Sequence, residues 1–168
     1  TKIKITWNSP PPEHINGINT GYLVQIWYDP QHTQLAKATK VAHNGLTPLQ
    51  ATTMDGLLPY TDYYLTVRCS TNAGDGVPNE DQVVVKTKQD LPEIVESIEF
   101  ADVLDKSLRV IWRPPKRTNG ELSQYTLEYW DSTHERKLSK IFPPSINEAR
   151  IVDLTPQTQY TFRIYAHT

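Results

Sequence analysis

Cysteine is nearly absent from this sequence: Cys69 is the only one among 168 residues, so no disulfide can form within the chain. Any domain must therefore be held together by its packed core, which excludes a small disulfide-rich scaffold. Secreted domains without disulfides exist, so the cysteine count leaves the redox compartment open.

An excess of charge of one sign is also missing. The chain has 17 Lys and Arg against 19 Asp and Glu, and its formal net charge is −2 at pH 7. The sequence contains no block of like charge. It therefore lacks the basic surface with which proteins bind nucleic acids and anionic membranes. We therefore expect no nucleic-acid partner and no phosphate-binding role.

Long apolar stretches are lacking as well. The longest apolar runs are only a few residues, well short of the roughly 18 that a membrane-spanning helix needs. The residues Thr1–Lys4 do not begin a signal peptide. We expect any targeting or anchoring segment to lie outside this sequence.

Side chains that could carry catalysis or bind a metal are scattered. No histidine has a partner two or four residues away or a cysteine pair beside it, so there is no zinc motif. Asp29, Asp75 and Asp131 stand beside Pro, Gly or Ser in turn-like contexts. We predict a non-enzymatic chain with no cofactor, no metal and no small-molecule substrate. The histidines, which we expect in loops or at edges, are His14, His32, His43, His134 and His167.

Proline and aromatic residues are plentiful by contrast. Thirteen Pro, nine Tyr and four Trp accompany only seven Gly. Apolar residues recur at every second position in many short stretches, a period typical of half-buried β-strands, and turn residues separate these stretches. No segment shows a sustained helical period with caps. The sequence therefore predicts an all-β fold with no helix of consequence.

The pattern occurs twice. In both copies an alternating strand ends at a Trp before prolines, and an Asn-Gly pair and an aromatic strand follow. The matching segments are Trp7-x-x-Pro10 and Trp112-x-Pro114-Pro115, Tyr22-x-Val24-x-Ile26-Trp27 and Tyr125-x-Leu127-x-Tyr129-Trp130, and Leu57-x-Pro59-x-Thr61-x-Tyr63 and Leu154-x-Pro156-x-Thr158-x-Tyr160. The first copy is longer around 29–53, where surface loops tolerate insertions. Two homologous domains are predicted, 1–88 and 89–168.

Short strands fill each copy. They are predicted at 2–8, 20–28, 36–42, 50–54, 61–71 and 81–87 in the first copy and at 94–100, 107–113, 123–130, 136–142, 147–152 and 158–167 in the second. Strands of this length with turn signals between them favour antiparallel sandwiches. The linker, Lys88–Pro92, is short, and its proline should restrict hinging between the domains.

These residues carry a resemblance to a known family. The Trp before the Pro-rich turn, the Tyr-x-Val/Leu strand, the repeated Leu-x-Pro-x-Thr-x-Tyr stretch and the segment Asn72–Pro78 strongly resemble fibronectin type III domains. In detail, the sequence is similar to the repeats of neural adhesion receptors of the sidekick and contactin type. The resemblance implies two tandem, seven-stranded, antiparallel immunoglobulin-like sandwiches. It also places Tyr63 and Tyr160 at the family's tyrosine corner, where the hydroxyl bonds to upstream backbone.

Strand phase separates the predicted cores from the outward faces. One core should contain Trp7, Tyr22, Leu57 and Tyr63, and the other Trp112, Tyr125, Leu154 and Tyr160. Cys69 has the inward phase of its strand, so we expect a small packed residue rather than a reactive thiol.

Each copy also lacks one edge strand of the implied fold. The first copy starts almost at its Trp-bearing strand, whereas 94–100 supplies the preceding strand in the second copy. The second copy ends at Thr168, before any counterpart of Val83–Val85. Because such gaps expose unpaired backbone and one flank of each core, we expect the native protein to extend at both ends.

Aromatic and cationic side chains share the outward phase. The outward sets are Leu23, Gln25 and Trp27 beside Tyr64, Thr66 and Arg68, and Thr126, Glu128 and Trp130 beside Thr161, Arg163 and Tyr165. We expect each Trp to stack with the Arg of its domain, worth about 0.5–1 kcal/mol at an exposed site. Burial of the ring under its own neighbours is the simpler interpretation, but Trp and Arg also dominate protein interfaces. The candidate protein-binding surface is therefore Trp27, Arg68, Trp130 and Arg163.

The resemblance implies a pair of protein-recognition and spacer modules from the ectodomain of a cell-surface adhesion molecule or receptor. Their partner would be another protein, bound homophilically or heterophilically, and membrane attachment would come only from a segment outside this chain. One alternative is an intracellular, muscle-type structural array. Another is the ligand-binding part of a receptor kinase, phosphatase or cytokine receptor, although the Trp-Ser-x-Trp-Ser motif of cytokine receptors is missing before Val83.

Overall fold

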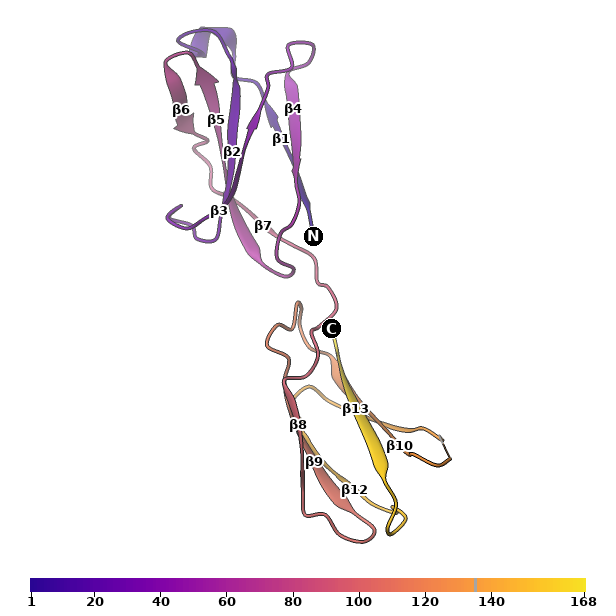
Figure 1. The fold of residues 1–168 in the computed structure, drawn as a ribbon. Coiled ribbons are helices and arrows are strands. Elements are labelled where there is room, and N and C mark those ends of the chain that lie inside the picture. Colours follow the sequence, from indigo (N-terminus) through magenta and orange to yellow (C-terminus); the bar gives the residue numbers. More distant parts are fainter. Residues whose placement is uncertain (135) are drawn as a thin grey trace. The chain divides into compact units, whose positions relative to one another are not determined.

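The computed structural model describes residues 1–134 and 136–168. The chain divides into two compact units, Thr1–Lys88 (unit 1) and Gln89–Thr168 (unit 2), each built almost entirely of antiparallel strands (Figure 1). The all-β prediction is confirmed. Within the described residues the one helical element is a 3-10 turn at Pro12–His14. None of the described helices is long and apolar enough to cross a membrane.

Two sheets make up unit 1. In the first, β1 (Ile3–Asn8) pairs with β4 (Leu49–Met54). The second has the order β3–β2–β5–β6, and β7 pairs with the half of β5 that β6 leaves open. The strands of this sheet are β2 (Gly21–Trp27), β3 (Leu35–Val41), β5 (Asp62–Thr71), β6 (Gly74–Pro78) and β7 (Val83–Lys86).

Unit 2 repeats this plan with a different complement of strands. Its sheets have the orders β12–β9–β8 and β11–β10–β13. In unit 2 the strand β8 pairs with the free side of β9, whereas the equivalent side of β1 in unit 1 has no described partner. In unit 1 the strands β6 and β7 pair with β5, whereas the equivalent side of β13 in unit 2 has no described partner. The strands are β8 (Ser97–Ala101), β9 (Leu108–Arg113), β10 (Gln124–Asp131), β11 (Leu138–Phe142), β12 (Glu148–Ile151) and β13 (Tyr160–His167).

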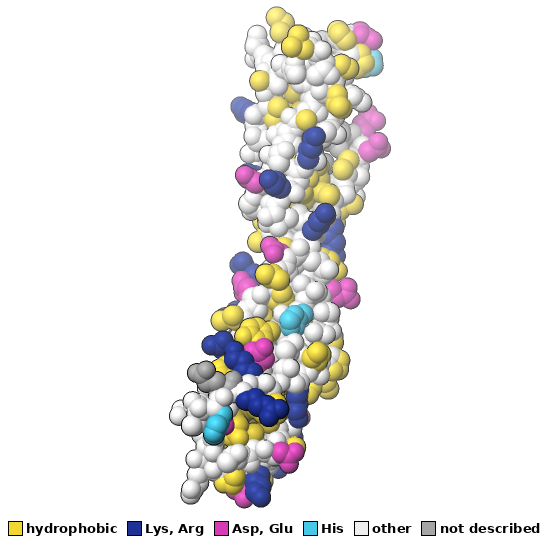
Figure 2. All heavy atoms as spheres, turned by 90° about the vertical axis from the view of Figure 1, so that its right-hand side faces the viewer, with side chains coloured by type: hydrophobic (Ala, Val, Ile, Leu, Met, Phe, Trp, Pro, Cys, Tyr) yellow, Lys and Arg dark blue, Asp and Glu magenta, His cyan; other side chains and the backbone are white. Residues whose placement is uncertain are grey.

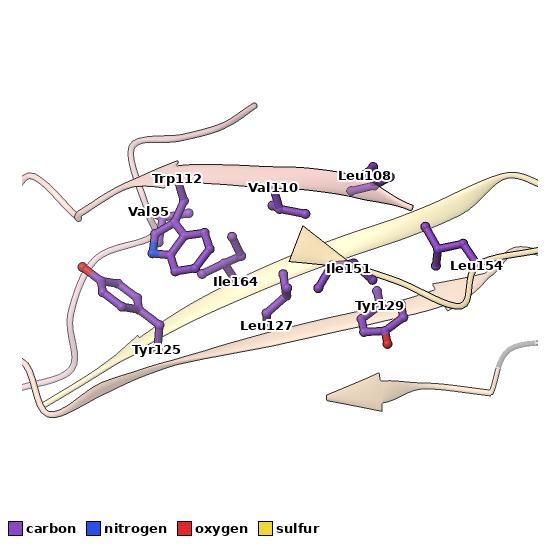
Figure 3. Close-up of a cluster of buried hydrophobic side chains, with 10 residues drawn as sticks. All are labelled: Val95, Leu108, Val110, Trp112, Tyr125, Leu127, Tyr129, Ile151, Leu154 and Ile164. Carbon is purple, nitrogen blue, oxygen red and sulfur yellow. The ribbon is translucent and has the colours of Figure 1, made fainter. Parts of the chain in front are cut away.

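Each unit has its own apolar core, as the strand phases predicted. In unit 2 the side chains of β9 and β10 point toward one another (Figure 3), and Trp112 and Tyr125 are fully buried with their rings edge to face, centroids 5.7 Å apart. Tyr22, Leu57 and Tyr63 are buried together in unit 1. Trp7 packs on this core but is only partly buried.

The segment after β5 differs from the prediction. Its Gly, Asp and Pro residues indicated a turn throughout, yet Gly74–Pro78 forms strand β6. Gly74 has φ 127, a conformation that glycine adopts without strain, and this closes a tight hairpin onto Thr71. The pairing shifts register between Arg68 and Ser70, as at a β-bulge. The strand predicted from 94 begins later, at Ser97.

The tyrosine corner is present in both units. The Leu58 backbone N–H donates to the Tyr63 hydroxyl, and the Thr155 N–H donates to the Tyr160 hydroxyl, each at 2.9 Å. Burial raises the pKa of Tyr63, so this phenol stays protonated at neutral pH. These tyrosines tie a loop to the core and are structural.

Tyr22 and Tyr125 occupy equivalent places but differ in the partners of their hydroxyls. The Tyr22 hydroxyl bonds to Asn19 and Ser9 at 2.9 Å and to His43 at 3.0 Å. The Tyr125 hydroxyl is buried with no hydrogen-bond partner among the described residues. The matching positions in unit 2 hold Leu122, Pro114 and Pro144, none of which offers a polar side chain.

This contrast predicts opposite outcomes for one substitution. Tyr22→Phe should lower the free energy of unfolding of unit 1 by about 1 kcal/mol, because it removes satisfied hydrogen bonds. Tyr125→Phe should leave unit 2 unchanged or stabilise it by up to about 1 kcal/mol, because it removes a buried hydroxyl that lacks a partner. Thermal unfolding of both variants measures the difference. Equal losses in the two variants would contradict the assignment.

Candidate functional site

The sheet around β2 turns an ordered set of side chains outward. The pairing of β2 with β5 places Trp27 opposite Tyr64, Gln25 opposite Thr66 and Leu23 opposite Arg68. The predicted set therefore shares one face of the sheet, on which Thr66 alone of the six is buried. The neighbouring strands extend these lines. We call Leu35, Trp27, Tyr64 and Val84 the Trp27 row, and Ala38, Gln25 and Thr66 the Gln25 row.

Unit 2 presents an equivalent face on β11, β10 and β13. Trp130 lies opposite Thr161, Glu128 lies between Ser139 and Arg163, and Thr126 lies between Ile141 and Tyr165. Ile141 is 65% exposed and Tyr165 is 42% exposed. Lys and Arg side chains lie beside hydrophobic ones on this side of unit 2 (Figure 2).

Trp130 is covered by two cations. The guanidinium carbon of Arg163 lies 5.3 Å from its ring centroid, and the Lys137 ammonium lies 4.9 Å from it. The predicted stacking of Arg163 on Trp130 is therefore confirmed. Lys137 comes from the turn before β11, and strand phase alone did not single it out. The two cations hold the ring in place and leave a charged rim around it.

The indole of Trp27 has a different environment. Its Nε1–H donates to the Thr66 hydroxyl at 2.9 Å, and its ring lies 5.6 Å from that of His32. Arg68 lies opposite Leu23 and donates from Nη1 to the Gly76 carbonyl at 3.0 Å. The prediction that Trp27 stacks with Arg68 is wrong, because the two residues share a face but stand four residues apart along paired strands, about 14 Å.

Asp131 and His134 form a polar turn next to Trp130. The Asp131 carboxylate contacts His134 Nδ1 at 2.8 Å and accepts from the backbone N–H groups of Thr133 and His134. The hydrogen bond from His134 lowers the pKa of Asp131. The Asp131 carboxylate therefore stabilises a turn by accepting from its backbone amides, as the sequence indicated.

The remaining reactive groups do not gather into a centre. Cys69 is partly buried against the core of unit 1, and burial raises the pKa of its thiol, so the nucleophilic thiolate is disfavoured. The described residues contain no group of three or more His, Cys, Asp or Glu side chains placed to hold a metal ion. What the molecule offers instead is two broad sheet faces.

The fold, the duplicated cores and the two tyrosine corners point to one family. The family model of the fibronectin type III domain matches residues 1–86 and 93–168. The chain belongs to this family. Its relatives include chicken (Gallus gallus) Protein sidekick-2, 36% identical over 170 residues, and Drosophila melanogaster Protein sidekick, 35% identical over 176 residues. Human (Homo sapiens) Protein sidekick-1 is 31% identical over 176 residues. Each match covers 100% of this chain and 8% of the relative.

The two fibronectin type III domains therefore share a scaffold and differ in what their outward faces carry. Sequence patterns assigned the face correctly but missed Leu35 and Val84, which complete the Trp27 row. The alternation in Val83–Val85 could have indicated Val84. Leu35 was hidden by a register shift between Ile26 and Trp27, which adds a residue to β3.

Proposed function

We propose that the chain is a pair of non-enzymatic protein-recognition and spacer modules in the extracellular part of a cell-surface adhesion molecule or receptor. The observation that carries this proposal is the pairing of aromatic and cationic side chains on an outward sheet face, clearest at Trp130, Lys137 and Arg163. Trp and Arg on a rigid sheet are the residues that most often anchor protein complexes. The sidekick relatives, which match over the whole chain, support placement outside the cell.

The junction between the units supports a spacer role. The Lys88 carbonyl accepts from the Tyr60 N–H within unit 1. In unit 2 the Gln89 side chain accepts from the Glu121 N–H, and the Asp90 N–H donates to the Asn119 carbonyl at 2.9 Å. Lys88 is thus bonded within unit 1 and Gln89 within unit 2, so the boundary between the two units falls between adjacent residues.

Substitution on the two faces tests the recognition role. Beads that carry many copies of the chain should bind to cultured neuronal cells, since the sequence resembles the repeats of neural adhesion receptors. Trp27→Ala, Arg68→Ala, Trp130→Ala and Arg163→Ala are compared with the native chain. At least one Trp variant should weaken binding about 30-fold, which corresponds to about 2 kcal/mol, while its melting temperature stays nearly unchanged.

The control is an alanine substitution of one exposed side chain in each domain that lies away from the two faces. Lys4 in unit 1 and Val103 in unit 2 are exposed and lie off both faces. Their alanine variants should bind as the native chain does. If the Trp variants lose stability but keep full binding, the rings serve packing alone and the faces are not the recognition surface.

A further inference from the structure

The outward side of β5 carries a line of side chains with opposite charges at its two ends. From one end to the other its residues are Asp62, Tyr64, Thr66 and Arg68. Six residues of extended strand hold the carboxylate and the guanidinium about 20 Å apart. Consider a two-fold axis that crosses the middle of this line and runs across the strands in the plane of the face. A second copy generated by this axis faces the first, with its Asp62 over Arg68 and its Tyr64 over Thr66.

Side-chain size also differs between the two sides of this axis, because the Trp27 row and the Gln25 row carry side chains of different bulk. The Trp27 row is bulky, and its ends protrude, because Leu35 is 49% and Val84 is 55% exposed. The Gln25 row beside it is low at its two ends, because Ala38 is small and Thr66 is 2% exposed with its hydroxyl bound to the Trp27 indole, while Gln25 between them is partly exposed. A raised row next to a shallow one is self-complementary after the same rotation.

The charged side chains of this face lack ion-pair partners in the described part of unit 1, although the Arg68 guanidinium donates a hydrogen bond to the Gly76 carbonyl. Asp62, Arg68 and Lys40 form no ion pair among the described residues. Lys86 lies opposite Asp62, but its ammonium lies 3.8 Å from the centroid of the Tyr60 ring. In unit 2, by contrast, the oppositely charged residues Glu128 and Arg163 lie directly opposite each other on neighbouring strands.

We propose that this face of unit 1 binds the same face of a second copy of the chain across a two-fold axis that lies between the Trp27 row and the Gln25 row. Each Trp27 row then rests on the Gln25 row of the other copy, and each Arg68 meets the Asp62 of the other copy. A two-fold interface uses one patch twice, so it requires the antisymmetry that this face has. The inference rests on the proposed recognition role and names its partner.

The small size of the face limits the strength of the contact. Four strands about 4.8 Å apart and a length of about 20 Å give on the order of 300 Å² per copy. That is well below the ~800 Å² per partner of a stable complex, so the dissociation constant in solution should be about 1 mM. Arrays of copies on a surface would add avidity to this weak contact.

Concentration-dependent NMR of the 168-residue chain tests the proposal. Between about 0.05 and 2 mM, amide shifts should change in β2, β3, β5 and β7 and fit a dissociation constant near 1 mM. Arg68→Glu or Asp62→Arg alone should weaken dimerisation at least about tenfold. The double variant, which restores the pair with its charges exchanged, should return to within about threefold of the native value.

Two further variants keep the test specific. Val84→Lys places a charge on the Trp27 row and should abolish the shift changes. Lys4→Glu makes the same change of charge as Arg68→Glu on the exposed side of β1 and should have no effect. Melting curves of all variants confirm that each one is folded.

Three outcomes would overturn the proposal. The first is an absence of concentration dependence at 2 mM. The second is a set of shift changes confined to β1 or β13, which would mean pairing of open strand edges instead. The third is a double variant as weak as the single ones. If beads still bind cells while the chain stays monomeric, the recognition role stands and its partner is a different protein.

Discussion

Replacing Trp112 with alanine should lower the free energy of unfolding of unit 2 by about 3–5 kcal/mol. The ring is fully buried between β9 and β10 and packs on both Tyr125 and Phe142, with centroids 5.7 and 5.6 Å away. Its Nε1–H has no hydrogen-bond partner among the described residues, so the loss comes from packing. The free energy of unfolding of a domain of this size is about 5–15 kcal/mol, so the variant should be close to unfolding.

Calorimetry with domain-resolved hydrogen exchange measures this effect. The transition of unit 2 should fall by at least about 12 °C, while that of unit 1 stays in place because the cores are separate. Trp130→Ala is the matched control: the same residue type on the next strand faces outward, so it should cost less than about 1.5 kcal/mol. Similar losses for Trp112 and Trp130 would contradict the assigned strand phases.

The second large effect is expected from Gly21→Ala in unit 1. Gly21 has φ 145, and a Cβ atom there would lie 2.5 Å from the Val41 carbonyl oxygen. That oxygen belongs to the backbone of β3, so the clash cannot be relieved by a side-chain rotation. Backbone strain and separation of β2 from β3 should together cost about 3 kcal/mol.

Gly45→Ala provides the control, because a Cβ atom at Gly45 meets nothing within 4 Å. It should change the stability of unit 1 by less than about 0.5 kcal/mol. Chemical unfolding of the two variants gives the comparison directly. If Gly21→Ala were as stable as Gly45→Ala, the close approach of β2 and β3 at Val41 would be wrong.

Period-two patterning predicted most of the side chains that enter each core, although Trp7 and Tyr160 only pack against the cores and stay partly buried. Trp112, Tyr125 and Leu154 are buried together as the alternation required, and the tyrosine corners at Tyr63 and Tyr160 have the expected backbone bonds. These features depend on positions within one strand or one corner. The sequence determines such local phases almost completely.

Features that depend on pairing between strands were harder to predict. Trp27 and Arg68 were placed on the correct face, but only the register shows that they stand two rows apart. The strand β6 was missed because its Gly and Pro residues usually mark turns. The partners of Tyr22 come from loops, where no period exists, so the contrast with Tyr125 could not be predicted.

Hydroxyl-radical footprinting of the bead-bound chain, with and without attached neuronal cells, shows whether the outward sheet faces are the recognition surface. It reports which aromatic side chains a bound partner covers. Recognition through the sheet faces predicts protection of Trp27 and Tyr64, or of Trp130 and Tyr165, with no change at Tyr60 in the loop before β5. Protection of Tyr60 with full reactivity of the four face residues would contradict recognition through the sheet faces.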